Sequence, residues 1–445
     1  DLVVPILARV MPLETAGRVF LSLVLGLLAS GTVALHAVLH RRWSLWPLLS
    51  FLFLYNSVFL WGFLNYLFGL GLAFWSFAAW VAWRDGSAAR IIPLFSLLAT
   101  ALFFAHIFAL GVFGLLIAGF EVGQWWTGTV RRHFGHWVKA FAPFLLPGLL
   151  LLASPLFDTN RENVPPWIQL EANPHGIAFA HPAAVLEAFK GTLRTEHLTL
   201  DRLTALALIA LVLGGAWTRR LSVAPAMIGP LAIITVATWL MPASIVTGAY
   251  VEIRLPVALI LLAIAGTDFL VQDRRKIAAL ALILCALFGV RMSAITVHWQ
   301  EANRQYAEFF DAIERLPPGS RIFSAIVKRG YGYVDFRIPT SIPVENLACW
   351  AVISKSALVS VIFSAPNQQP LRLAQPYRRF FSTGELMARS YIMNWEAVQK
   401  QYDYLLARQD ERFRPPMPAG MAPIFVGRHF ALYQMPGAEP GPNGT

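Results

Sequence analysis

The sequence predicts an α-helical polytopic membrane protein with a small C-terminal α/β domain. The run from Trp43 to Trp83 contains no Asp, Glu, Lys or Arg, and as one helix it would be about 60 Å long, roughly twice the hydrocarbon thickness of a bilayer. This run must therefore cross the membrane, turn and cross back. Hydrophobic residues make up 57% of the chain and charged residues 14%, whereas soluble domains carry roughly 25% charge. From Glu301 onward the composition becomes that of a soluble domain.

Hydropathy predicts about ten membrane spans. They are 19–40, 44–60, 64–83, 91–105, 107–124, 139–157, 203–217, 222–241, 255–271 and 277–297. Polar residues and glycines mark the turn inside the uncharged run: Tyr55, Asn56, Gly62, Asn65, Tyr66 and Gly69. Bent backbone at that depth is stable only against protein or water, so we expect a polar pocket there. Residues 2–13 are apolar but interrupted by prolines and an arginine, which indicates a short helix at the membrane surface.

Clusters of basic residues predict the orientation of these spans. The clusters are His40–Arg42, Arg84–Arg90, Arg131–Lys139, Arg219–Arg220 and Asp273–Lys276. They alternate with segments poor in Lys and Arg, so one orientation places every cluster in the cytoplasm. In that orientation the extracytoplasmic segments are the loops 1–18, 158–202 and 242–254, the turns near Asn65 and His106, and everything after 298. The net charge of +11 is explained by these orientation signals, and nucleic acid is not expected as a partner.

The chain is therefore predicted to contain a transmembrane domain over 1–297 and an extracytoplasmic α/β domain over 298–445. Within the second domain we expect a helix at 301–315 that ends before Pro317-Pro318-Gly319, strands at 321–327 and 358–363, a helix that passes into a strand over 395–406, and a last strand at 429–434. In the loop 158–202, Pro182 to Arg194 predicts an amphipathic helix that lies on the membrane.

Four segments resemble a known family. One of them, Tyr55 to Leu72, lies where members of this family have a polar, aromatic turn between spans. Leu13-Glu14-Thr15-Ala16-Gly17-Arg18, before a span that contains Gly, resembles the turn before the second span of C-type membrane glycosyltransferases, the polyprenyl-phosphate-sugar enzymes that include aminoarabinose and protein mannose transferases. Val251 to Val257 is similar to the Arg-Tyr-x-x-Pro element that opens a late span, with Leu255 in place of the Tyr and the Pro one position earlier. Phe104-Ala105-His106 resembles the Thr-His or Ser-His near the outer end of another span.

The resemblance implies an enzyme that moves a sugar from a polyprenyl-phosphate-linked donor to an envelope acceptor, at the periplasmic face of a bacterial inner membrane. Its partners would be that donor and the membrane lipids. In the family an acidic residue in the first extracytoplasmic loop is the catalytic base, and here that loop would precede Asp1. We therefore expect the catalytic acid and one more span upstream of Asp1, so that the chain is truncated at its amino end.

Arg254 is the leading candidate for substrate binding. Sugar transfer from a lipid phosphate needs cations that stabilise the leaving phosphate at the outer face of the membrane. Arg254 lies at the mouth of a predicted span beside Tyr250 and Glu252, and a guanidinium can hold a phosphate through two parallel hydrogen bonds. The structural alternative is an arginine that anchors the helix end or pairs with Glu252.

The predicted turns supply the other candidate substrate-binding residues. They are Asn56, Asn65, Tyr66 and His106. These residues converge with Arg254 if the turns are placed correctly, and the alternative role for them is to hold membrane helices together.

No metal ligand or cofactor is assigned. The loop 158–202 is rich in His, Asp and Glu, but no pair has zinc spacing on a predicted helix. The chain has no Gly-rich phosphate loop, nucleophile elbow or His-Glu-x-x-His motif. The sequence is compatible with a requirement for a divalent metal. It is also compatible with two other functions: a transporter or flippase for a lipid-linked molecule, and a non-catalytic membrane scaffold. A transporter should have related halves and charged sites near the midplane, and the sequence indicates neither.

Overall fold

The structure, a computed structural model, describes the greater part of the chain. The described residues are 3–42, 44–126, 134–154, 177–245, 248–270, 273–325, 346–362, 371, 373–377, 380, 395–409 and 420–436. The chain divides into two compact units. We call residues 1–157 with 177–293 the bundle, and residues 158–176 with 294–445 the C-terminal unit.

Seven helices among the described residues are long and apolar enough to cross a membrane, which confirms a multi-pass helical protein. They are α2 (Leu13–His40), α4 (Leu64–Trp83), α5 (Ala88–Ala105), α6 (Ile107–Trp126), α11 (Leu198–Trp217), α14 (Arg274–Glu314) and the stretch Gly135–Leu152, in which α7 (Phe134–Phe141), η2 (Ala142–Phe144) and α8 (Leu145–Leu152) follow one another. The remaining predicted spans are shorter apolar helices: η1 (Trp46–Phe53) with α3 (Ser57–Leu60), η5 (Pro225–Met227) with α12 (Ile228–Leu240), and α13 (Arg254–Gly266). Two short helices, α1 (Val3–Leu7) and α10 (Pro182–Gly191), lie where helices on the membrane surface were predicted.

The predicted span 44–60 is a 3₁₀ helix followed by one α-helical turn, which corrects the expectation of a continuous α-helix. Pro47 occupies the first turn of η1, which ends at Phe53. Asn56 caps α3, since its Oδ1 accepts the N–H of Phe59 at 3.0 Å. A 3₁₀ helix rises about 2.0 Å per residue, against about 1.5 Å for an α-helix, so η1 extends for about 16 Å and α3 for about 6 Å. Trp46 at the start of this segment contacts Phe269, and Trp61 just after it contacts Tyr250.

Helix α5 ends just before His106 and helix α6 begins just after it, as predicted. The backbone of His106 is extended (φ −171°), and its Nδ1 accepts the N–H of Phe108 at 3.1 Å. The imidazole thus satisfies one of the free N–H groups at the start of α6. By contrast, the helices predicted at 277–297 and 301–315 are one helix, α14, of 41 residues. No Pro or Gly lies between them, and α14 ends just before Pro317.

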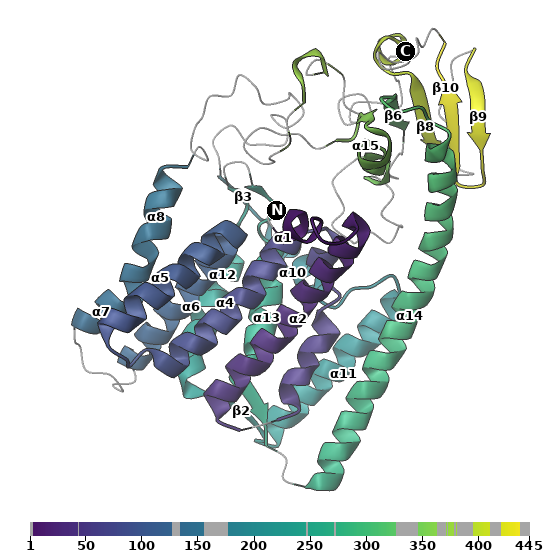
Figure 1. Cartoon of the computed structure of the whole chain (residues 1–445). Helices are drawn as coiled ribbons and strands as arrows, with labels where there is room; N and C mark the ends of the chain where they lie inside the picture. Colours follow the sequence, from purple (N-terminus) through teal and green to yellow (C-terminus); the bar gives the residue numbers. More distant parts are fainter. Residues whose placement is uncertain are drawn as a thin grey trace. The chain divides into compact units, whose positions relative to one another are not determined.

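Helices α2, α4 and α6 run in the same direction, side by side (Figure 1). Phe20 of α2 contacts Phe68 of α4, and further along Trp75 of α4 donates to Ser30 of α2 at 3.0 Å. Glycines let these helices approach closely, because a Cβ on Gly71 would lie 2.7 Å from the backbone of Leu27. Small residues at helix contacts are typical of membrane bundles, where backbone proximity replaces the hydrophobic driving force.

The described residues of the basic clusters gather at one end of the bundle, which we call the basic end. Lys139 donates to the carbonyl oxygen of Arg84 at 2.9 Å, and Arg42 pairs with Asp268. Strands β2 (Leu221–Val223) and β5 (Thr267–Phe269) form a two-stranded ribbon there, next to Arg220. At the opposite end lie the turn at His106, the start of α13, and the small antiparallel sheet of β1 (Ile177–Phe179), β3 (Pro242–Ile245) and β4 (Gly248–Ala249).

The C-terminal unit is a five-stranded mixed sheet in the order β7-β6-β8-β10-β9. Its strands are β6 (Arg321–Ala325), β7 (Leu358–Val359), β8 (Tyr404–Arg408), β9 (Ala422–Val426) and β10 (Phe430–Gln434), and its other helices are η6 (Leu347–Cys349), α15 (Trp350–Lys355), η7 (Gln375–Tyr377) and α17 (Trp395–Gln401). Strand β6 is parallel to β7 and β8, and β10 is antiparallel to β8 and β9. Phe309 of α14 packs on one face with Ile322, and Val398 of α17 packs on the other with Phe323. This confirms the predicted strands near 321, 358, 404 and 430. Strand β9 was not predicted.

Candidate functional site

The predicted site residues Arg254, Tyr66 and His106 lie together at the end of the bundle opposite the basic end. The Arg254 guanidinium carbon lies 4.5 Å from the centre of the Phe63 ring, 4.8 Å from that of Phe108 and 6.0 Å from that of Tyr66. Only 6% of Arg254 is exposed. An aromatic face attracts a cation, and the attraction grows when water is excluded. The rings therefore hold the guanidinium at a fixed position.

Tyr66 connects three helices at this point. Its hydroxyl donates to the carbonyl oxygen of Arg254 at 2.9 Å, and its ring meets the His106 ring edge-on with centroids 5.6 Å apart. Tyr66 lies in the first turn of α4, His106 lies in the turn between α5 and α6, and Arg254 is the first residue of α13. The bundle thus joins segments that are 188 positions apart in sequence.

Glu252 and Tyr250 complete the group, which we call the Arg254 cluster: Phe63, Tyr66, His106, Phe108, Tyr250, Glu252 and Arg254. Glu252 is 3% exposed, and its Oε2 is buried without a hydrogen bond from any described residue. Burial raises the pKa of the Glu252 carboxyl, and the nearby charge of Arg254 acts in the opposite direction. Tyr250 has a positive φ of 60°, a conformation that non-glycine residues adopt rarely and that is concentrated at functional sites.

The two predicted asparagines have different positions. Asn56 is fully buried and bonds its own turn, where its Nδ2 donates to the carbonyl oxygen of Phe53 at 2.8 Å. Its contacts are those of a helix cap. Asn65 is half-buried in the first turn of α4, next to Tyr66. Sequence reasoning missed Phe63 and Phe108, because only the fold reveals which phenylalanines of an apolar run face a cation.

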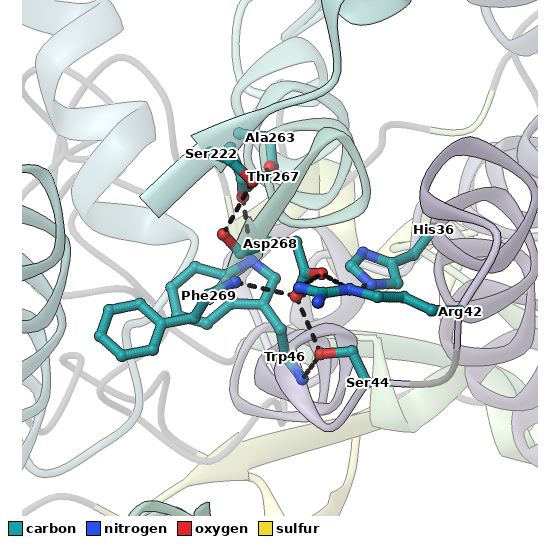
Figure 2. A network of polar contacts seen from close by, with 9 residues as sticks. All are labelled: His36, Arg42, Ser44, Trp46, Ser222, Ala263, Thr267, Asp268 and Phe269. Carbon is teal, nitrogen blue, oxygen red and sulfur yellow. Dashed lines mark hydrogen bonds and ion pairs between the residues drawn. The ribbon is translucent and has the colours of Figure 1, made fainter. Parts of the chain in front are cut away.

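A second polar group lies at the basic end (Figure 2), and we call it the Asp268 network: His36, Arg42, Ser44, Trp46, Thr267 and Asp268. Asp268 is fully buried and accepts hydrogen bonds from Arg42 Nε at 2.5 Å and from Ser44 Oγ at 2.9 Å. Trp46 Nε1 donates to Thr267 Oγ1 at 2.9 Å, and the Trp46 ring stacks on Phe269. These contacts attach the loop after α2 to the end of α13.

Asp268 is charged in this network. Burial alone would raise the pKa of its carboxyl, but the hydrogen bonds from Arg42 and Ser44 and the charge of Arg42 outweigh burial and hold the pKa below its usual value. A depressed carboxyl pKa adds stability above the unfolded-state pKa, and this stability is lost as the pH falls through the folded-state pKa. The network is thus complete at neutral pH.

His36 of this network and its neighbour His40 both belong to α2, and neither was predicted as a site residue. His36 Nε2 lies 3.9 Å from Asp268 Oδ1, and the His36 and His40 ring centroids are 4.4 Å apart. Both ring nitrogens of His36 and Nε2 of His40 are buried without hydrogen bonds from the described residues. The i, i+4 spacing of the pair was the available signal. Among the residues that the structure describes, no group of three or more His, Cys, Asp or Glu could hold a metal ion.

Comparison with known proteins assigns no family to the chain: no family model, curated protein or solved structure matches it.

Proposed function

We propose that the protein is an integral membrane glycosyltransferase that transfers a sugar from a polyprenyl-phosphate-linked donor to an acceptor in the cell envelope. The observation that carries this proposal is the Arg254 cluster, which combines a fixed guanidinium, a buried carboxylate and aromatic rings at one end of a membrane bundle. A guanidinium stabilises the charge that grows on a departing phosphate. Aromatic rings suit the isoprenoid chain and the apolar faces of a sugar.

The location of the cluster agrees with this chemistry. Basic clusters mark the cytoplasmic side of membrane proteins, and the Arg254 cluster lies at the other end. We therefore propose a bacterial inner-membrane protein whose Arg254 cluster opens to the periplasmic face. Helix α14 begins at the basic end with Arg274, so a single crossing would put the C-terminal unit in the periplasm as well.

A transporter or flippase of a lipid-linked molecule is the second candidate, and the Asp268 network favours it. Buried His and Asp side chains in membrane helices often belong to proton pathways. A proton-coupled transporter would require a pH gradient for activity, whereas a glycosyltransferase in detergent would not.

The test is donor consumption by the purified full chain in detergent or nanodiscs. Undecaprenyl phosphate linked to labelled glucose, mannose or aminoarabinose is supplied with an extract of envelope glycolipids, and the release of undecaprenyl phosphate is measured. We expect release from at least one donor, above that of protein-free nanodiscs and without a pH gradient. No release from any donor would contradict the proposed function.

A further inference from the structure

We infer that Glu252 is the group that takes the proton from the acceptor hydroxyl during sugar transfer. The inference rests on the proposed function, and it differs from the resemblance described above, which implies a base upstream of Asp1. It gives the Arg254 cluster a general base, Glu252, in addition to the cation that binds the phosphate.

The first argument is the state of the Glu252 carboxylate. Only 3% of Glu252 is exposed, and its Oε2 has no hydrogen bond from a described residue. Leaving such an oxygen unsatisfied is unfavourable, and more so when the group is charged. Buried oxygens of this kind are rare in folded proteins, and each requires an explanation. A substrate hydroxyl that donates to Oε2 supplies one.

The second argument is the position of Glu252 beside Arg254. The two residues belong to the short segment that enters α13, and each influences the ionisation of the other. A base and a phosphate-binding cation must flank the same sugar carbon, because the acceptor attacks as the phosphate leaves. The backbone before Glu252 is held in the left-handed conformation at Tyr250, so the segment is not a relaxed loop.

The third argument concerns three other described carboxylates toward this end of the bundle, each of which has a structural contact. Glu187 pairs with Lys190 at 2.6 Å, and Glu196 Oε1 accepts the hydroxyl of Tyr55 at 2.9 Å. Asp201 accepts from Thr195 and pairs with Arg291. These contacts connect the three acids to neighbouring side chains or backbone groups of the bundle.

The proposed step balances in atoms and charge. The bond between the anomeric carbon and the phosphate oxygen breaks, and its electron pair leaves with the phosphate, which Arg254 binds. A bond forms between the anomeric carbon and the acceptor oxygen. The acceptor proton moves to Glu252 Oε2, which turns the carboxylate into a carboxylic acid. Water removes that proton after the products leave.

The test compares Glu252→Gln with Glu187→Gln, a matched change of a partly exposed carboxylate on α10. Full-length proteins in nanodiscs are assayed for donor consumption, as above, and for binding of undecaprenyl phosphate. We expect Glu252→Gln to lower turnover by about 100-fold or more while its affinity for undecaprenyl phosphate stays equal or rises, because a negative charge near the phosphate is removed. Glu187→Gln should retain both.

The pH profile gives a readout that a purely structural role would not change. Wild-type turnover should fall as the pH drops through the pKa of Glu252, which burial raises, and the residual turnover of Glu252→Gln should lack this limb. If Glu252→Gln retains wild-type turnover, or loses affinity for undecaprenyl phosphate together with turnover, the inference is overturned while the proposed function survives. Absence of turnover in the wild type would instead overturn the proposed function and the inference together.

Discussion

Replacing Arg254 by methionine is expected to lower donor turnover by about 100-fold or more and to abolish competition by undecaprenyl phosphate. Removal of one group that stabilises developing charge typically has an effect of this size. Methionine keeps an apolar stem between Phe63 and Phe108, so packing is largely preserved. Arg254→Lys should recover only part of the activity, because an ammonium keeps the charge but not the two-point geometry of a guanidinium.

The control for Arg254 is Arg84, the corresponding arginine at the basic end. The Arg84 guanidinium carbon lies 4.8 Å from the centre of the Phe120 ring, and its Nη1 lies 3.1 Å from Glu121 Oε1. Arg84→Met thus removes a partly buried, aromatic-stacked arginine far from the proposed site. Its turnover per folded molecule should stay within a few fold of the wild type. Equal turnover in Arg254→Met and Arg84→Met would reduce Arg254 to a structural role.

The second large effect is expected on stability, at Arg291. Arg291 is 2% exposed, and its guanidinium donates to Asp201 Oδ1 at 2.9 Å and to the carbonyl oxygen of Leu193 at 2.6 Å. It attaches α14, whose apolar stretch is only 6% buried, to α11 and to the segment just after α10. Arg291→Met leaves the Asp201 charge buried, and breaking a buried pair in this way costs about 3–5 kcal/mol.

Thermal unfolding in detergent checks this expectation. Arg304→Met, which removes an exposed pair with Glu301 on the same helix, should leave the melting temperature nearly unchanged, since such pairs contribute about 1 kcal/mol or less. The double variant Arg291→Met with Asp201→Asn should be more stable than Arg291→Met alone, because no buried charge remains unpaired. A melting temperature of Arg291→Met equal to that of Arg304→Met would show that the pair does not hold α14.

The membrane class and most helix positions could be predicted from the sequence, because composition and length alone indicate which segments cross a bilayer. The turn at His106 was predictable from the basic segments on both sides, which require an even number of crossings. The 3₁₀ segment at Trp46–Phe53 could not be predicted, since its hydropathy equals that of an α-helical span. The merger of two predicted helices into α14 was missed because polar residues after Val297 read as a boundary, although nothing there stops a helix.

The site was partly predictable for a similar reason. Arg254 and Glu252 are charges at the edge of an apolar segment, and such charges are visible in a sequence. The aromatic rings around Arg254 could not be predicted, because the rotation of each helix about its axis determines which of its aromatic residues face the guanidinium. The Asp268 network joins positions that are 226 residues apart for Arg42, and no local pattern reports a contact of that separation.

The central claim is that the Arg254 cluster binds the phosphate of a polyprenyl lipid, and photocrosslinking tests it most directly. A polyprenyl phosphate with a diazirine on its first isoprene unit is added to the wild-type protein in nanodiscs, and crosslinked peptides are identified by mass spectrometry. We expect crosslinks in the segments around Phe63, Phe108 and Tyr250, displaced by undecaprenyl phosphate and lost in Arg254→Met. Crosslinks that concentrate instead at the basic end, or that persist unchanged in Arg254→Met, would contradict the claim.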